Sequence, residues 1–197
     1  MIRKLGLLLF IIGIVTLGYS GWQYYQSTQS VQEIPKPSQA KASPAAAADD
    51  REEENHSTLE RELETGEEIA SLDIPQLDKR FDTFWGTDED TLGSGVGMYV
   101  SEWTTVPNRE EGHTVLSGHR DTVFTGLKEL GEGDTLSIQY EGETYEYEIT
   151  KTWITDADDR SVIVEKEEPT LTLTTCYPFD FIGNAPDRYI IEAELVT

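Results

Sequence analysis

The chain has 197 residues, of which 38 are acidic and 15 are lysine or arginine, giving a formal net charge of −23 at pH 7. This length allows one domain of ordinary size together with additional segments. The single cysteine, Cys176, excludes an intrachain disulfide. A surface of this charge repels phosphate backbones, which excludes nucleic acid as a partner.

An uncharged, mostly apolar stretch, Leu5–Trp22, lies near the N-terminus. Its 18 residues would span about 27 Å as a helix, close to the thickness of the hydrocarbon core of a bilayer. Arg3 and Lys4 precede it, so the positive-inside rule places the N-terminus in the cytoplasm and the bulk of the chain outside the cell. We therefore expect residues 1–25 to form a cytoplasmic tip and a single-pass membrane anchor. A cleaved signal peptide is the alternative, although Gly18–Ser20 is a poor cleavage site.

A polar segment follows the predicted anchor. Gln26–Ala48 is rich in Ser, Pro, Ala and Gln, and Asp49–Glu68 is rich in acids. Neither part can bury a core, so residues 26–68 are predicted to form a flexible acidic linker. The folded domain is expected to occupy residues 69–197.

Alternating polar and apolar residues divide this domain into many short predicted strands. Glu141-Gly142 is typical of a hairpin turn, and the glycine-rich Leu92–Gly97 predicts a loop. The pattern favours an all-β fold, a closed or nearly closed β-barrel of about eight strands with one or two short helices, preceded by a single N-terminal transmembrane helix. The predicted strands are Ile69–Ile74, Phe81–Trp85, Met98–Val100, Thr114–Ser117, Thr135–Tyr140, Glu143–Thr155, Ser161–Val164, Thr170–Cys176 and Arg188–Val196.

The clearest helical signal lies in Asp121–Gly131. Phe124, Leu127 and Leu130 recur every three residues, and Asp121 is a suitable N-cap. The segment therefore predicts a short helix that ends at Gly131.

Cys176 ends the predicted strand Thr170–Cys176. Alternation places Leu171, Leu173 and Thr175 on one face and Thr172, Thr174 and Cys176 on the other. If the leucines face the core, the thiol faces outward. An outward cysteine at the end of a strand is a candidate nucleophile, because most cysteines are buried apolar residues.

Cysteine catalysis also needs a proton donor for the leaving group. His119 follows a predicted strand, where loops often carry catalytic side chains, although a histidine there is more often part of a turn. His113 opens that strand and is more typical of a structural residue, and His56 lies in the acidic linker. His119 is therefore the candidate acid.

Arg188 is the candidate group for the developing oxyanion. It shares its strand face with Glu192 and Glu194, opposite the apolar residues, and so points outward. If its strand pairs antiparallel with Thr170–Cys176, Arg188 and the thiol fall at the same end. The alternative is a surface arginine paired with an acid such as Asp187.

The segments Leu116–Thr122, Thr170–Cys176 and Ala185–Ile190 together resemble the sortases, the cysteine transpeptidases of Gram-positive bacteria. The order His, Cys, Arg and the 12-residue step from Cys176 to Arg188 carry the resemblance. It implies a sortase-like barrel over about residues 69–197 with His119, Cys176 and Arg188 as catalytic residues. Cys176–Phe179 and Ala185-Pro186 are most similar to class D sortases. The departures at Gly97-Met98 and Gly112-His113 concern the subclass rather than the activity.

The resemblance implies a substrate peptide of the Leu-Pro-x-Thr-Gly or Leu-Pro-x-Thr-Ala type, presented by a secreted protein. The Cys176 thiolate would attack the threonine carbonyl, and a peptidoglycan precursor amine would resolve the thioester. Thr174 shares the outward face of Cys176 and is expected to line the peptide groove. Thr175 and Tyr177 flank the nucleophile and complete the predicted substrate-binding residues.

Asp156, Asp158 and Asp159 form a candidate calcium cluster, since some sortases use calcium in an acidic loop. Their spacing matches no EF-hand pattern, and acids occur throughout this chain. No cofactor is expected otherwise.

Three alternatives stay open at this point. The first is a membrane-anchored, non-catalytic barrel that binds the cell wall, in which Cys176 would be incidental. The second is a cysteine enzyme acting on peptidoglycan itself, although the chain lacks the His-Gly-Cys cluster of the L,D-transpeptidase type. The third is a pilin-polymerising sortase, which usually carries a lid segment and a second membrane span.

Overall fold

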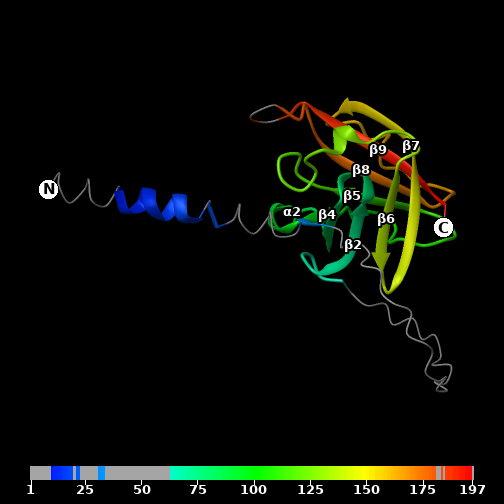
Figure 1. Ribbon diagram of the computed structural model, residues 1–197, viewed down its shortest axis with the longest axis horizontal. Helices are drawn as coiled ribbons and strands as arrows, with labels where there is room; N and C mark the ends of the chain where they lie inside the picture. Colours follow the sequence, from blue (N-terminus) through cyan, green and yellow to red (C-terminus); the bar gives the residue numbers. More distant parts are fainter. Residues whose placement is uncertain are drawn as a thin grey trace, which may run out of the picture.

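The computed structural model describes residues 10–19, 21–22, 31–33, 63–180, 183 and 185–196. Its strands form one sheet in the order β1-β3-β2-β6-β7-β9-β8-β5-β4, and an additional pairing of β3 with β4 closes β2 to β9 into an eight-stranded barrel (Figure 1). The pairs β3–β4 and β5–β8 are parallel, and the other pairs are antiparallel. The predicted all-β barrel is therefore confirmed.

The strands are β1 (Val31–Glu33), β2 (Glu68–Ile74), β3 (Lys79–Trp85), β4 (Val96–Met98), β5 (His113–Ser117), β6 (Thr135–Tyr140), β7 (Glu143–Asp156), β8 (Thr170–Tyr177) and β9 (Asp187–Leu195). The short helices are α2 (Glu89–Ser94) and the 3-10 turns η1 (Pro75–Leu77) and η2 (Leu127–Glu129). The predicted hairpin turn joins β6 to β7. Glu141 and Gly142 there have φ angles of 50° and 83°, the left-handed pair that a type I′ turn requires.

The helix predicted over Asp121–Gly131 is wrong. Successive turns follow His119, and only η2 is helical. Gly126 has a φ angle of 98°, which a helix cannot contain. Phe124, Leu127 and Leu130 are nevertheless buried in the core, so their spacing marked an inward-facing segment correctly but not its backbone conformation.

Two further local predictions are wrong. Ser161–Val164 forms no strand, and the carbonyl of Val164 is bonded to the ring of His113 instead of a neighbouring strand. The expected loop Leu92–Gly97 includes the end of α2. Asp88 begins that helix because its side chain accepts hydrogen bonds from the backbone N–H groups of Asp90 and Thr91.

The barrel interior is filled by the inward side chains of all eight strands and by the segment after His119. Phe81 and Phe124 meet there edge to face, with ring centroids 6.0 Å apart. Leu171, Leu173 and Thr175 face inward as predicted and are buried. Burying each large apolar side chain contributes about 1.5–3 kcal/mol to stability, so Phe124 is a strong anchor for the segment that follows His119.

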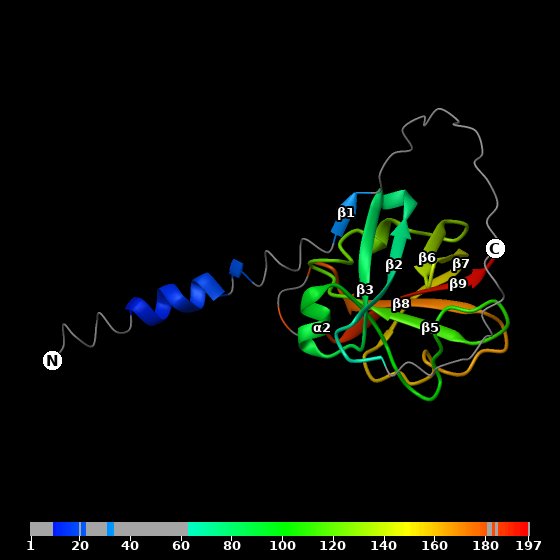
Figure 2. The same cartoon turned by 90° about the horizontal axis from the view of Figure 1, so that it is seen from below.

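Near the N-terminus, residues 10–19 and 21–22 are helical. Within the described part of the chain, no helix is both long and apolar enough to cross a membrane. The rest of the expected anchor lies outside the described residues, as does His56, so the anchor stays a prediction. Within the segment predicted as a linker, β1 lies beside β3, with Val31 opposite Phe81 and Glu33 opposite Lys79 (Figure 2).

Candidate active site

The expected catalytic residues lie on or just after three neighbouring strands, β5, β8 and β9. These strands lie side by side in the sheet (Figure 1). β5 and β8 run parallel, with Ser117 opposite Thr174. The residues that follow both strands therefore emerge at the same edge of the sheet. β8 and β9 run antiparallel, and Cys176 lies directly opposite Arg188. The antiparallel pairing that the sequence analysis assumed is confirmed.

A cavity of about 320 Å³ opens at this edge. It brings together His119, Cys176 and Arg188, which lie far apart in the chain. Cys176 and Arg188 are half-buried and His119 is exposed, so the thiol is accessible to a substrate and is not sealed in the core. The lining is completed by Arg120, Asp121, Gly183 and Ala185.

The loop that carries His119 is bonded to the strand that carries Cys176. The Gly118 N–H donates to the carbonyl of Thr174 at 3.2 Å, and the Thr175 hydroxyl donates to the carbonyl of Gly118 at 2.7 Å. The chain then turns back, and the Phe124 N–H donates to the carbonyl of His119 at 2.9 Å. These bonds fix the backbone of His119 between the barrel core and β8.

Gly118 has no space for a side chain. A Cβ at this position would lie 2.7 Å from Cγ2 of Val123 and 2.8 Å from Cδ2 of Phe124. The glycine is therefore required by the close packing of the chain on either side of His119.

Arg188 is held by backbone carbonyls. Its Nη1 donates to the carbonyl of Asp187 at 3.0 Å and to that of Ala185 at 3.4 Å. Within the described part of the chain it forms no ion pair, so pairing with the Asp187 carboxylate is not observed. Among the residues that the structure describes, the guanidinium therefore has no carboxylate partner in the cavity, and it can donate to an incoming oxygen.

Comparison with known proteins places this geometry in a family. The family described as "Sortase domain" matches residues 72–196 of the chain. The chain is also 41% identical to Sortase D of Bacillus subtilis (strain 168), over 96% of this chain and 97% of that protein. The chain belongs to the sortase family.

Solved structures of other sortases share the fold. The catalytic domain of B. anthracis SrtD is 60% identical, with a TM-score of 0.61 over 72% of this chain and 96% of that chain. An X-ray structure of Clostridium perfringens sortase C with the C-terminal cell wall sorting motif is 25% identical, with a TM-score of 0.62 over 69% of this chain and 74% of that chain. The present sortase is a transpeptidase of class D.

Arg120 is a site residue of this sortase that sequence reasoning missed. Its Nη2 donates to the carbonyl of Gly183 at 2.9 Å. The bond joins the His119 loop to the connection between β8 and β9, so Arg120 closes one side of the cavity. Its position next to His119 was the only signal in the sequence.

The three predicted substrate-binding residues take different positions. Thr174 is half-buried on the outward face, two residues before the thiol. The side chain of Thr175 is buried, and only its backbone lies beside the nucleophile. Tyr177 meets Phe179 edge to face at 6.0 Å, and Phe179 in turn contacts Tyr189 at 5.3 Å. Binding of a peptide by these residues stays a prediction.

The carboxylates proposed for calcium stabilise turns in this sortase. Asp156 accepts a 2.8 Å bond from the backbone of Asp158. Asp159 accepts from the N–H and hydroxyl of Ser161 and from the hydroxyl of Thr155, and these hydrogen bonds, the Ser161 hydroxyl first, lower the pKa of Asp159 to about 2. Across the residues that the structure describes, no group of three His, Cys, Asp or Glu side chains is placed to hold a metal ion.

Proposed function

We propose that this sortase cleaves a sorting signal of the Leu-Pro-x-Thr-Gly or Leu-Pro-x-Thr-Ala type after the threonine and transfers the protein to a cell-wall amine. The observation that carries the proposal is the placement of Cys176, His119 and Arg188 around one cavity, with Cys176 directly opposite Arg188. The solved C. perfringens sortase C with the C-terminal cell wall sorting motif supports a peptide of this class as substrate.

In the first step the Cys176 thiolate attacks the threonine carbonyl carbon and forms the C–S bond. The guanidinium of Arg188 donates hydrogen bonds to the carbonyl oxygen as it becomes negative. The C–N bond of the scissile peptide then breaks, and protonated His119 gives its proton to the leaving amine. The products are a thioester on Cys176 and the released C-terminal peptide.

In the second step an amine of a peptidoglycan precursor attacks the thioester carbon. Neutral His119 accepts a proton from that amine, the C–S bond breaks, and the thiolate is restored. Thr174, on the outward face beside Cys176, would line the path of the peptide. Donation from Arg188 to the oxyanion is expected to raise the rate of acyl transfer about 100-fold or more.

We further propose that residues 1–25 anchor the enzyme in the cell membrane and hold the catalytic domain on the extracellular side. The support is the uncharged stretch Leu5–Trp22 preceded by Arg3 and Lys4. Protease treatment of intact protoplasts should degrade the domain and leave the N-terminal tip protected. Protection of the whole chain, or its release into the medium, would contradict the anchor.

The function is tested with the full-length chain in detergent, a fluorogenic sorting peptide of each type, and an amine nucleophile. The wild-type protein should accumulate a thioester adduct on Cys176, visible by mass spectrometry after an acid quench, and turn it over when the amine is added. Cys176→Ala should give neither adduct nor transfer, since no other residue of the site can hold the acyl group. Equal turnover by both proteins would show that Cys176 is not the nucleophile, and absence of adduct and turnover in both would contradict the proposed substrate.

A further inference from the structure

A loop covers the outward face of the strands that carry the active site. Residues 157–169, here called the outer loop, join β7 to β8. The loop starts where the Ala157 N–H donates to the carbonyl of Pro186 at 3.1 Å, two residues before Arg188. It lines a cavity of about 540 Å³ together with Tyr99 and Trp103. The placement of the outer loop therefore shapes the surface beside the catalytic cavity.

The outward face beneath the outer loop is buried and partly apolar. Val115 and Ile190 are buried although they point away from the barrel core. The outer loop contributes Val162, which is also buried. The loop is thus in place on the sheet, and its polar attachments decide how firmly it is held.

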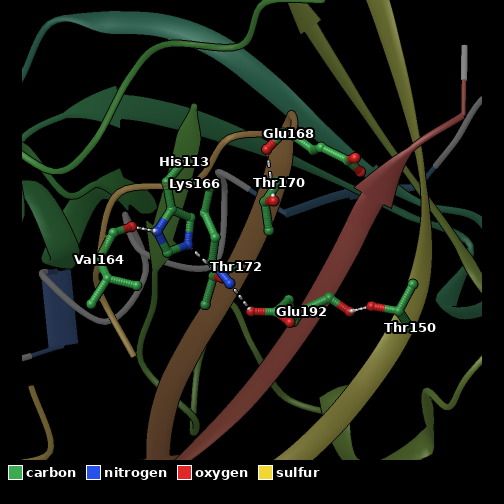
Figure 3. A network of polar contacts seen from close by, with 8 residues as sticks. All are labelled: His113, Thr150, Val164, Lys166, Glu168, Thr170, Thr172 and Glu192. Atoms are coloured by element: carbon green, nitrogen blue, oxygen red, sulfur yellow. Dashed lines mark hydrogen bonds and ion pairs between the residues drawn. The ribbon is translucent and has the colours of Figure 1, made fainter. Parts of the chain in front are cut away.

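His113 makes the central polar attachment. Its Nδ1 lies 2.7 Å from the carbonyl oxygen of Val164 in the outer loop, and its Nε2 lies 2.7 Å from the hydroxyl of Thr172 on β8 (Figure 3). A carbonyl oxygen only accepts hydrogen bonds, so Nδ1 must carry the proton. In the neutral ring Nε2 then accepts from the Thr172 hydroxyl. In the uncharged imidazole both ring nitrogens therefore have a hydrogen-bond partner, and the residue is wholly buried.

The charged groups that face His113 are Lys166 of the outer loop and Glu192 of β9. They form an ion pair of 2.8 Å, which makes a second attachment of the loop to the sheet (Figure 3). Burial lowers the pKa of His113, the charge of Lys166 lowers it further, and the bond to Val164 and the charge of Glu192 raise it. The net direction is downward, so the attached loop disfavours the imidazolium.

We propose that His113 is a positioning residue whose neutral imidazole fastens the outer loop to the strand of the nucleophile, and whose protonation releases that loop. The inference rests on the proposed function, since the loop matters to catalysis only if a peptide binds beside Cys176. Protonation puts a hydrogen on Nε2, so the Thr172 hydroxyl must turn from donor to acceptor, and it places a buried positive charge beside Lys166. Opening of the outer loop exposes the ring to water, which solvates that charge.

The direction of the pH effect follows from linkage. In the open state the ring is hydrated and has the ordinary histidine pKa of about 6.5, whereas in the closed state its pKa is lower. The open state therefore binds more protons. The ratio of open to closed loops rises as pH falls below 6.5, at most about tenfold per pH unit, and levels off below the closed-state pKa.

The test combines two measurements on the full-length protein that need no substrate. Nitrogen NMR of ¹⁵N-histidine-labelled protein at about pH 7.5 should report a neutral His113 with its proton on Nδ1. Hydrogen exchange of the amides in residues 157–169, corrected for the intrinsic rate, should accelerate severalfold between about pH 7.5 and pH 5.5. The amides of β6 serve as the internal control. A ring protonated on Nε2 or charged at pH 7.5, or an outer loop whose protection does not respond to pH, would overturn the proposal.

Two variants distinguish the effect of protonating His113 from a general weakening of the attachment of the outer loop. In His113→Asn the side-chain NH₂ can take the place of Nδ1 and donate to Val164 without titrating, so loop exchange should no longer depend on pH. In Lys166→Met the cation is gone and Glu192 is left facing the ring, so the closed-state pKa of His113 should lie nearer the ordinary histidine value. The acceleration of loop exchange between about pH 7.5 and pH 5.5 should therefore be smaller than in the wild type, whereas loss of the ion pair raises loop exchange at both pH values alike. This second variant decides the matter if the first fails to fold. An acceleration as large as that of the wild type, or larger, would contradict the mechanism.

Activity supplies the link to catalysis. The ratio of wild-type to His113→Asn kcat/KM for the sorting peptide should fall with decreasing pH, because acid releases the outer loop only in the wild type and the other pH effects on the reaction are common to both proteins. If neither protein turns over the peptide while hydrogen exchange of the outer loop still depends on pH, the proposed function is contradicted. The attachment of the loop by neutral His113 is then still supported. If both proteins turn over the peptide and the ratio of their kcat/KM values is independent of pH, the role of His113 in catalysis is contradicted. The proposed function is then still supported.

Discussion

The hydroxyl of Thr175 donates a 2.7 Å hydrogen bond to the carbonyl oxygen of Gly118. The donor immediately precedes Cys176 in the chain, and the acceptor immediately precedes His119. The separation of the thiol and the imidazole is thus fixed by a short path through two backbones. Inward-facing Thr175 therefore contributes to the site without entering the cavity.

Replacement of Thr175 by Val removes this bond and leaves the buried carbonyl of Gly118 with no side-chain donor. We expect a loss of about 1–3 kcal/mol in the free energy of unfolding and a fall in kcat with little change in KM. Denaturant titration and peptide kinetics measure the two effects. Thr135→Val, at an exposed site on β6, is the matched control and should change neither quantity. Full activity of Thr175→Val would show that the link does not position His119.

Gly118→Ala tests the close packing beside His119. The new methyl group would lie 2.7 Å from Val123 and 2.8 Å from Phe124, so the His119 loop must shift. Overpacking of this kind costs about 1–3 kcal/mol, and we expect kcat/KM to fall at least tenfold. In the matched variant Gly131→Ala the methyl group meets nothing within 4 Å. A Gly118→Ala protein with normal kinetics would refute the packing requirement.

Arg188→Lys tests whether the fork of the guanidinium is needed. A lysine keeps the charge but cannot bond two carbonyls and an oxyanion in one plane. We expect kcat to fall about 100-fold with the fold retained, as for removal of an oxyanion donor. Arg109→Lys, an exposed arginine 3.5 Å from Glu143, is the matched control. Near-normal turnover of Arg188→Lys would reduce the role of Arg188 to charge alone.

The sequence predicted most of the strands but not the segments that depend on distant contacts. Alternation located β6, β7, β8 and β9 to within one or two residues because each has one face on the core. Apolar residues at every third position of Asp121–Gly131 correctly indicated burial. They did not establish a helix, because a series of turns gives the same spacing of buried residues. In Ser161–Val164, the partner of Val164 is a ring 51 residues away, and no local pattern encodes it.

The positions of the site residues were predictable where alternation along a strand determined which way a side chain points. Cys176 and Arg188 were placed outward by alternation, and their register confirms the expected pairing. Alternation alone could not show that Thr172, on the same outward face, is fully buried, because the outer loop covers it. Arg120 was missed because its role depends on a contact with Gly183.

The ion pair between Asp73 and Arg80 gives a prediction about stability. The two side chains lie opposite each other on β2 and β3 and form two bonds of 2.6 Å, and the bond to Asp73 raises the pKa of Arg80. Arg80→Leu leaves a largely buried carboxylate alone, and we expect it to lower the free energy of unfolding by about 1.5–3 kcal/mol. Lys128→Leu breaks an exposed contact of 4.0 Å with Asp180 and should cost less than about 0.5 kcal/mol. Equal effects in denaturant titrations would contradict the distinction.

Asp159 gives a prediction about acid titration. Its folded pKa of about 2 lies below the usual value, so its contribution to stability is present above about pH 4 and is lost as pH falls through the folded value. Ser161→Ala removes the hydroxyl bond that lowers this pKa most and should move the titration upward. Carbon NMR of the carboxyl group follows it directly. A wild-type Asp159 that titrates at the ordinary value would show that the turn bonds do not form in solution.

The position of β9 between β7 and β8 has a consequence for the newly made protein. β9 is the last strand of the barrel in chain order, and it contributes Arg188. Until its residues have left the ribosome, the barrel has a gap and the thiol has no guanidinium opposite it. The enzyme therefore completes its reactive centre only when the last barrel strand is in place, so a half-made chain carries the thiol without its cation.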